Sequence, residues 1–158
     1  MGAGQVDNLA IHQALEIVRP GDVIVVDGGR ATDRALVGEI MKVLAQTRQV
    51  AGFVIDGAIR DVEAYREDDF PCFARAVIHR GPYKNGPGRI GVPVQVGGTV
   101  IAPGDVVVGD ADGVVAFPVS EVAGLLEAAA VHLHQEEKIL AAIRDGIYDG
   151  AYAKPRSR

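Results

Sequence analysis

The chain has 158 residues, and 16 lysines and arginines stand against 21 aspartates and glutamates, which gives a formal charge of −5. This length corresponds to one domain and is enough to bury a core without disulfides or metal clusters. The acidic balance argues against a nucleic-acid-binding surface, because phosphate contacts need clustered cations. A single cysteine excludes an internal disulfide and favours a reducing compartment.

Membrane association is not expected from this sequence. No stretch reaches the roughly 18 uninterrupted apolar residues of a membrane-spanning helix. Residues 1–6 lack the charged and apolar regions of a signal peptide. We therefore expect a cytoplasmic protein.

The first half of the chain alternates between helical and strand-like segments. A helix is expected over residues 8–18, with Asp7 or Asn8 as its cap, and the apolar run 23–26 is typical of a buried strand. A second helix is expected over 33–47, with Asp33 as its N-cap and an apolar stripe of Leu36, Ile40 and Leu44. The further predicted elements are a strand over 50–55, a helix over 61–67 and a strand over 72–78. This alternation predicts an α/β fold with a parallel βαβ layer.

The second half changes character. Residues 80–91 are rich in glycine, proline, asparagine and arginine, which predicts a loop. Short strands alternate with turns over residues 94–117, so this part is expected to be β-rich. A long helix with an apolar stripe is expected over 120–144, followed by a loose tail over 145–158. Together these segments predict one domain over residues 1–158.

Several features that resemble binding motifs are better explained by ordinary structure. Residues 86–91 spell G-x-G-x-x-G, but they lie in a loop and contain a proline, whereas a dinucleotide site needs a strand before and a helix after the motif. Residues 110–113 resemble the start of a calcium loop but lack its further ligands, so a hairpin turn is favoured. His132 and His134 are two apart on a helix and face different directions, and Cys72 is interpreted as a small buried hydrophobe.

Arg60 and Asp61 are more informative because of their position. They follow the predicted strand 50–55 across a turn at Asp56–Gly57, and ligands of open α/β sheets collect at the carboxyl ends of strands. The competing interpretation is that Asp61 only caps the next helix and Arg60 is solvated. A second candidate is Gly38: if a helix breaks or begins there, the amides of residues 38–41 could bind a carboxylate. The competing interpretation is that Gly38 lies inside the helix 33–47 and allows close packing.

Many separate motifs, in order over about residues 7–118, resemble those of the RraA-like family. The motifs that carry the resemblance are Val26–Gly29, Arg34–Met41, Val54–Asp61, Gly81–Lys84, Val92–Val94, Gly97–Gly98, Pro103–Asp105 and Gly109–Val114. This family includes divalent-metal pyruvate aldolases acting on 4-hydroxy-4-methyl-2-oxoglutarate and 4-carboxy-4-hydroxy-2-oxoadipate, the regulator of ribonuclease E activity, and members labelled demethylmenaquinone methyltransferase. Its members usually have several dozen further residues before the segment that begins here at Asp7, and residues 1–6 match nothing.

The resemblance implies a swivelling β/β/α fold, assembled as a trimer or hexamer with active sites at subunit contacts. It also implies that the amides of Gly38, Glu39, Ile40 and Met41 hold the pyruvyl carboxylate. Arg60 would contact the same substrate, and Asp61 would ligate Mg²⁺ or Mn²⁺, partly through waters. Arg60 and Asp61 are thus the expected catalytic residues.

The chemistry implied is a retro-aldol cleavage, which leaves an enolate of pyruvate. The chain's lysines (Lys42, Lys84, Lys138 and Lys154) fall on predicted helices, a loop and the tail, and nothing in the sequence indicates the desolvated pocket of a Schiff-base lysine. A divalent ion is the other way to stabilise the enolate. We therefore expect a metal-dependent lyase that acts on small 2-oxo acids, with possible oxaloacetate decarboxylase activity. The alternative is a non-catalytic regulator that binds ribonuclease E. Ribonuclease E is expected as a partner only under this alternative.

Overall fold

The computed structural model describes residues 6–150 and 152, and the chain divides after Phe117 into two compact units. The first unit is built on a four-stranded, fully parallel sheet with β3 at its centre. β4 pairs with one edge of β3, while β1 and β2 pair one after the other with its opposite edge. The strands of this sheet are β1 (Val23–Val26), β2 (Ala35–Val37), β3 (Gly52–Ile59) and β4 (Cys72–Val77).

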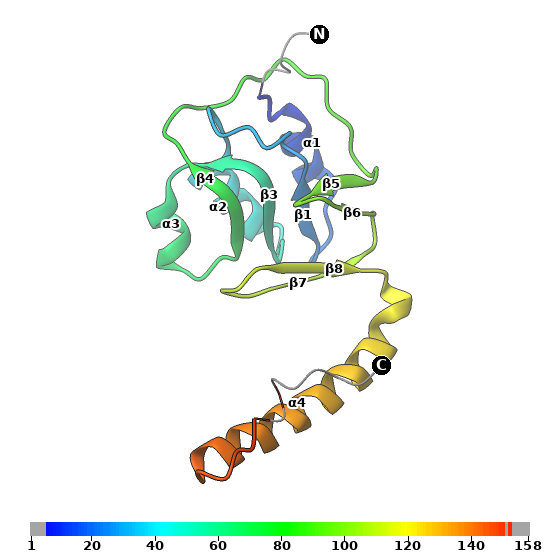
Figure 1. The fold of residues 1–158 in the computed structure, drawn as a ribbon. Helices are drawn as coiled ribbons and strands as arrows, with labels where there is room; N and C mark the ends of the chain where they lie inside the picture. Colours follow the sequence, from blue (N-terminus) through cyan, green and yellow to red (C-terminus); the bar gives the residue numbers. More distant parts are fainter. Residues whose placement is uncertain (1–5, 151, 153–158) are drawn as a thin grey trace. The chain divides into compact units, whose positions relative to one another are not determined.

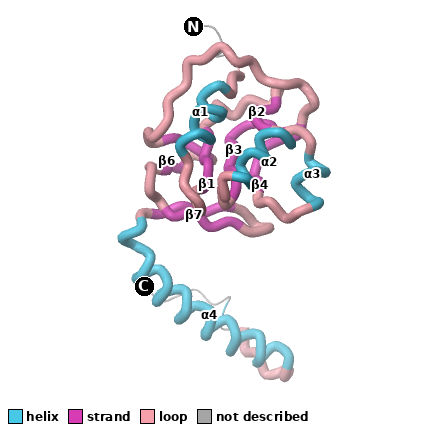
Figure 2. The backbone as a smooth tube through the Cα atoms, turned by 180° about the vertical axis from the view of Figure 1, so that it is seen from behind, coloured by secondary structure: helices cyan, strands magenta, loops and turns pink. Residues whose placement is uncertain are grey.

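Helices α1 (Leu9–Ile17) and α2 (Glu39–Thr47) lie over one face of this sheet, and the short α3 (Val62–Glu67) lies beside α2 (Figure 2). The core forms between these helices and the apolar strands. Leu15 of α1 and Ala45 of α2 are wholly buried, as is Phe53 of β3. The ring of Phe53 meets that of Phe70 edge-on, with 5.1 Å between ring centroids. Every residue of β3 is buried, because neighbouring segments cover both faces of this strand.

Two antiparallel hairpins complete the first unit (Figure 1). They consist of β5 (Val94–Val96) with β6 (Thr99–Ile101) and β7 (Val106–Gly109) with β8 (Val114–Phe117). The buried Asp56 of β3 attaches the first hairpin, because its carboxylate accepts a hydrogen bond from the Gly97 amide at 3.2 Å. Arg75 of β4 pairs with the same carboxylate and lowers the pKa of Asp56. The mixed α/β fold with a parallel layer and a β-rich second half is therefore confirmed.

The second unit contains a short 3₁₀ helix, η1 (Val119–Glu121), and the long helix α4 (Val122–Arg144). The helix expected over 120–144 is confirmed, but none of the residues of α4 as the structure describes it is buried. Among the described residues, no helix is long and apolar enough to cross a lipid bilayer. Of the expected tail over 145–158, positions 151 and 153–158 lie outside the described residues, as do residues 1–5.

The expected helix over 33–47 is wrong in its first part. Residues 35–37 form the buried strand β2 instead, because three consecutive apolar residues pair with the end of β3. The helix begins only at Glu39, with Gly38 rather than Asp33 as its N-cap. Its expected apolar stripe is also wrong: Ile40 is 76% exposed, and the buried positions are Met41, Lys42 and Ala45.

The turn expected at Asp56–Gly57 is also absent from this part of the described chain, because β3 runs on to Ile59. Gly57 is needed for close packing between strands and not for a turn. A Cβ at this position would lie 2.8 Å from the Leu36 side chain of β2, closer than carbon atoms approach. The glycine therefore lets β2 pack against β3, and Arg60 follows the strand directly.

Candidate functional site

The candidate site lies where β3 ends and α2 begins. Arg60 is the first residue after β3, and its amide donates to the carbonyl of Val37, the last residue of β2. Gly38 follows Val37 and is the N-cap of α2. Parallel pairing of β2 with β3 therefore brings Gly38 and Arg60 together at the carboxyl edge of the sheet, where α/β proteins bind ligands.

The N-terminus of α2 offers backbone donors at this edge. The first amides of any α-helix have no acceptor within the helix, and the aligned peptide dipoles favour an anion there. In α2 these amides belong to Glu39, Ile40 and Met41, three of the four residues expected to hold a carboxylate. Their side chains do not form a pocket: Glu39 and Ile40 are exposed, whereas Met41 is buried and its sulfur accepts a hydrogen bond from Asn8.

The Asp61 carboxylate occupies this helix N-terminus. Its Oδ2 accepts a hydrogen bond from the Glu39 amide at 3.0 Å and lies 3.3 Å from Nε of Arg60. Asp61 is the N-cap residue of α3, but within the described chain its side chain makes no capping hydrogen bond to that helix. The simple explanation of Asp61 as the cap of α3 is therefore wrong. Its left-handed backbone, with φ of 58°, turns the carboxylate toward α2.

Gly38 makes this close approach possible. A Cβ at position 38 would lie 2.5 Å from Oδ2 of Asp61 and 2.8 Å from Cγ of Arg60. Both distances are well inside van der Waals contact, so any side chain there would displace both residues. Glycine is needed at this position for the space it leaves to the two charged side chains.

Arg60 is partly enclosed, with 39% of its side chain exposed. Gly81 lies next to its guanidinium, and a Cβ there would be 3.2 Å from Nη1. Arg34 holds this loop in place: it donates to the Gly81 carbonyl at 2.7 Å and to the Tyr83 hydroxyl at 2.8 Å. Its guanidinium also stacks 4.1 Å from the centre of the Tyr83 ring. The sequence motif around Gly81 thus forms one wall beside Arg60.

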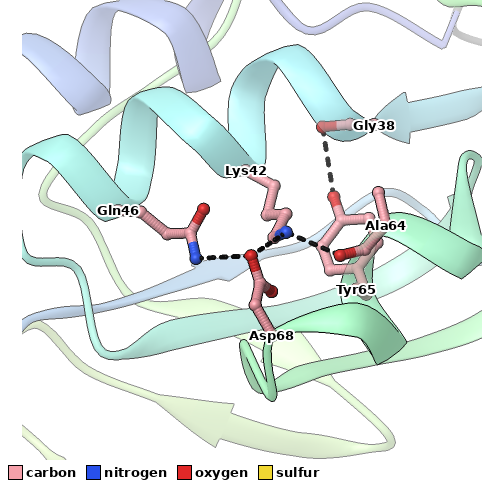
Figure 3. A network of polar contacts seen from close by, with 6 residues as sticks. All are labelled: Gly38, Lys42, Gln46, Ala64, Tyr65 and Asp68. Atoms are coloured by element: carbon pink, nitrogen blue, oxygen red, sulfur yellow. Dashed lines mark hydrogen bonds and ion pairs between the residues drawn. The ribbon is translucent and has the colours of Figure 1, made fainter.

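A buried lysine connects the two helices whose N-termini form the site (Figure 3). Lys42 of α2 is only 3% exposed, and its ammonium group donates to the Ala64 carbonyl of α3 at 2.6 Å and to the Asp68 carboxylate. Gln46 donates to the same carboxylate at 3.0 Å. The hydrogen bond from Lys42 lowers the pKa of Asp68. Sequence reasoning missed this contact, because Lys42 lies between apolar positions of the helix and was not expected inside.

Tyr65 of α3 makes a second connection to the site. Its side chain is buried, and its hydroxyl donates to the Gly38 carbonyl at 3.3 Å, as Figure 3 shows. Burial raises the pKa of this phenol, so Tyr65 remains protonated and can act as the donor. The N-terminus of α2 is therefore held against α3 both at Gly38 and one turn later at Lys42.

The other polar candidates have structural roles. Residues 110–113 form the turn between β7 and β8, where the Asp110 amide donates to the Gly113 carbonyl. His132 and His134 are exposed on α4. Cys72 packs against the core, and burial raises the pKa of its thiol to about 12, which leaves it unreactive. Among residues 6–150 and 152, no group of three or more His, Cys, Asp or Glu side chains could hold a metal ion.

A parallel strand that is buried along its length and is followed by an arginine–aspartate pair, next to the N-terminus of a helix, defines an α/β protein with a candidate site at the carboxyl edge of its sheet. The family model described as Aldolase/RraA matches residues 2–116, and the chain belongs to this RraA-like family. A relative from Halalkalibacterium halodurans is 41% identical over 89% of this chain and 67% of its own length. Its provisional name is 4-hydroxy-4-methyl-2-oxoglutarate aldolase.

A curated relative and a solved structure, both from Thermus thermophilus, give the comparison more detail. One is named 4-hydroxy-4-methyl-2-oxoglutarate aldolase and is 36% identical over 71% of this chain and 68% of its own length. The other is a solved structure, titled as the RNA-processing inhibitor RraA. It is 34% identical, with a TM-score of 0.68 over 72% of this chain and 70% of that one. The chain thus spans about two thirds of the length of these relatives. The two relatives named as aldolases support an aldolase-like enzyme.

Proposed function

We propose that the chain is a divalent-metal-dependent (class II) pyruvate aldolase that cleaves 4-hydroxy-2-oxo diacids such as 4-hydroxy-4-methyl-2-oxoglutarate. The observation that carries this proposal is the meeting of Arg60, Asp61 and the N-terminus of α2 at one point. This arrangement combines donors for a carboxylate with a carboxylate ligand for a cation. The names of the relatives support the same reaction class.

The substrate's pyruvyl carboxylate would bind at the N-terminus of α2. The amides of Glu39, Ile40 and Met41 would donate to it, helped by the helix dipole. The guanidinium of Arg60 presents a planar fork that suits a carboxylate or an enolate oxygen, and it lies on the same side as Gly38. Binding would therefore place the 2-oxo group next to Asp61.

Asp61 fits the role of a metal ligand. Its side chain is 41% exposed, so water can reach the carboxylate, and Mg²⁺ commonly keeps several waters and takes one or two protein carboxylates. A site with a single carboxylate agrees with the lack of a larger ligand cluster among the described residues. A bound divalent ion supplies Lewis-acid stabilisation of negative charge on the enolate oxygen, worth several kcal/mol.

The proposed cleavage breaks the bond between C3 and C4 of the substrate. The hydroxyl on C4 loses its proton, and this carbon becomes the carbonyl of the departing 2-oxo acid. The electron pair of the broken bond passes into the pyruvate enolate, which takes up a proton at C3 to give pyruvate. Oxaloacetate would lose CO₂ to form the same enolate, so we propose decarboxylation as a side activity of this site.

A Schiff-base mechanism is disfavoured by the surroundings of the lysines. Lys42 is close to the site, but its side-chain nitrogen is held by hydrogen bonds to the Asp68 carboxylate and the Ala64 carbonyl. Lys84 and Lys138 are exposed, and Lys154 lies outside the described residues. A nucleophilic amine needs the opposite environment, apolar and without a neighbouring carboxylate.

The alternative is a regulator that binds ribonuclease E without catalysis. It rests on the similarity to the Thermus structure titled as an RNA-processing inhibitor. The presence of Asp61 beside Arg60 favours the enzyme, since a regulator has no need of a cation ligand at this position.

A substrate panel tests the proposal. Metal-stripped protein is supplied with Mg²⁺ or Mn²⁺ and several 4-hydroxy-2-oxo diacids, and pyruvate is followed with a coupled dehydrogenase. We expect pyruvate from at least one diacid and slower release from oxaloacetate. No pyruvate from any of them, together with binding of a ribonuclease E fragment, would favour the regulator.

A further inference from the structure

The hydroxyl of Tyr65 reaches the peptide group at the start of α2 (Figure 3). It donates to the Gly38 carbonyl at 3.3 Å, and its ring lies in the core with 6.2 Å between its centroid and that of Phe70. The Lys42 amide donates to the same carbonyl at 3.0 Å, as the first hydrogen bond of the helix. A backbone carbonyl has two lone pairs and can accept both donors. Of these two hydrogen bonds, only the one from Tyr65 ties the carbonyl to an element outside α2.

The Gly38 carbonyl shares its peptide group with the Glu39 amide. A peptide group is planar, and in the trans form its C=O and N–H point in opposite directions. The N–H of this peptide donates to the Asp61 carboxylate at 3.0 Å. A donor at the carbonyl also polarises the peptide, which strengthens its N–H as a donor. Tyr65 therefore acts on the direction and the strength of the amide that meets a carboxylate at the N-terminus of α2.

The residue at position 38 does not itself fix this peptide plane. Glycine has no Cβ and allows a wide range of backbone angles, and a larger residue is excluded here by Asp61 and Arg60. The restraint has to come from other residues. Tyr65 lies one turn after Asp61, which is the N-cap of α3. Its hydrogen bond thus ties the first amide of α2 to the helix that follows the Asp61 carboxylate.

We infer that Tyr65 is a positioning residue for the carboxylate site, because through the Gly38 carbonyl it aims the Glu39 amide at the bound carboxylate. In the chain as described this carboxylate is that of Asp61. In the complex it is the substrate's, and for the substrate this role rests on the proposed function. Tyr65 acts without contacting the ligand, since its side chain is buried and lies on the carbonyl side of the peptide.

Tyr65→Phe tests the positioning without any substrate, because it keeps the ring and removes only the donor. Gly38–Glu39 is the one Gly-Glu pair in the sequence. Labelling with ¹³C at glycine carbonyls and ¹⁵N at glutamate therefore gives a single nuclear magnetic resonance signal that correlates the two nuclei across this peptide bond. In the variant we expect the Gly38 carbonyl carbon and the Glu39 amide proton to move upfield, because hydrogen bonding deshields both nuclei. Circular dichroism checks that the fold is kept.

Gln46→Met is the matched control, because it removes another hydrogen bond that reaches out from α2. Gln46 donates to Asp68, the residue after α3, at 3.0 Å and lies about two turns along α2 from Gly38. This control should leave the Gly38–Glu39 signal in place. An unmoved signal in Tyr65→Phe would overturn the inference. An equal movement in Gln46→Met would overturn it too, since that result would show a merely structural role.

Binding and turnover extend the test to the ligand. Pyruvate, titrated by calorimetry in the presence of Mg²⁺, should bind Tyr65→Phe about two- to tenfold more weakly than the wild type, which is the range of a single hydrogen bond. In turnover, KM should rise and kcat should stay near the wild-type value, because a bound carboxylate uses this donor equally in the substrate complex and in the transition state.

The outcomes separate the role of Tyr65 from the proposed reaction. A wild type that binds pyruvate and a Tyr65→Phe variant that binds it equally well would overturn the positioning role. A wild type that neither binds nor releases pyruvate would overturn the proposed aldolase instead. The Gly38–Glu39 signal would then still decide whether Tyr65 orients the first amide of α2, because that measurement needs no substrate.

Discussion

Oδ2 of Asp61 lies 3.0 Å from the backbone nitrogen of Glu39, so an acidic side chain from the end of β3 sits at the N-terminus of α2. This contact shows that the first amide of α2 can bind a carboxylate in the folded protein. The proposed substrate carboxylate would use the same donor and the same arginine. Binding of substrate and the position of the Asp61 carboxylate are therefore linked, which makes this side chain the most informative one to alter.

Asp61→Asn should remove most of the metal affinity and activity while the fold persists. The amide carries no charge for the cation, and asparagine tolerates the left-handed backbone of this position. We expect metal affinity to fall about tenfold or more, which corresponds to about 1.4 kcal/mol. Titration with Mn²⁺, followed by electron paramagnetic resonance, measures this directly.

Asp69→Asn is the matched control, because Asp69 is also an exposed aspartate with a positive φ, of 55°. It should bind the ion as the wild type does. Equal metal affinity in Asp61→Asn and the wild type would remove Asp61 from the metal site.

Arg60→Lys should weaken substrate binding and leave metal affinity near normal. Lysine keeps the charge but loses the planar fork. Hydrogen bonds to charged groups contribute about 1.5–3 kcal/mol, which corresponds to about 10- to 150-fold in affinity. Calorimetry with pyruvate measures the loss. Arg66→Lys, at an exposed ion pair with Glu63, is the control and should bind pyruvate normally. A loss of metal affinity in Arg60→Lys as large as the loss in Asp61→Asn would contradict this division of roles.

Gly38→Ala should impair the site by a steric clash alone. The new Cβ would meet Asp61 and Arg60 at 2.5 and 2.8 Å, so both side chains must move. Misplacement of catalytic groups by about 1 Å can cost roughly 100-fold in rate, and we expect a loss of this order in kcat/KM for pyruvate release. Gly124→Ala, where the added Cβ meets nothing within 4 Å, should keep full activity. An active Gly38→Ala enzyme would contradict the described geometry.

Lys42→Met should destabilise the first unit. Methionine can fill the buried space, but it leaves the Ala64 carbonyl and the Asp68 carboxylate without the ammonium donor. Loss of the partner of a buried polar group costs about 1–3 kcal/mol, and urea denaturation would show a lower midpoint. Lys138→Met, at an exposed lysine of α4, should leave the midpoint unchanged.

Acid should destabilise the first unit through Asp56 and Asp68. Hydrogen bonds from Arg75 and Lys42, respectively, lower the pKa of the two carboxyls in the folded chain, below the value of about 3.9 in an unfolded chain. Such groups contribute stability that is complete above the unfolded pKa and is lost as pH falls through the folded pKa. We expect Tm to decline below about pH 5.

This decline should be less steep in Asp56→Asn than in the wild type, because the variant has lost one of the two titrating groups. Glu63→Gln, at a solvated ion pair, serves as the control and should decline as the wild type does. An identical slope in Asp56→Asn would show that this carboxyl does not contribute to the acid sensitivity.

The sequence was sufficient for much of the fold, because apolar strands and turn residues are local signals. It predicted α1, β1, α3, β4 and α4 nearly at their observed bounds, and short strands with turns over the segment that forms the two hairpins. It failed at residues 35–37, where pairing with β3 overrode a helical pattern, and at Gly57, whose role depends on Leu36 of another strand. Contacts between distant residues decided both cases.

In the candidate site, too, local sequence patterns indicated some features, and contacts between distant residues decided the others. Arg60 and Asp61 could be found from their place after a strand. Gly38 was a candidate only if a helix began there, because the predicted helix over 33–47 enclosed it. That Asp61 faces α2 rather than capping α3 depends on its backbone angle, which no local pattern indicates. The burial of Lys42 could not be predicted either, since its partners are Ala64 of α3 and Asp68, the residue after that helix.

Pyruvate release from 4-hydroxy-4-methyl-2-oxoglutarate, measured as Mg²⁺ or Mn²⁺ is added back to metal-stripped protein, tests the central claim most directly. We predict no turnover without the ion, a rise that saturates with added metal, and a loss of this rise in Asp61→Asn. Full turnover in excess chelator would contradict a divalent-metal aldolase.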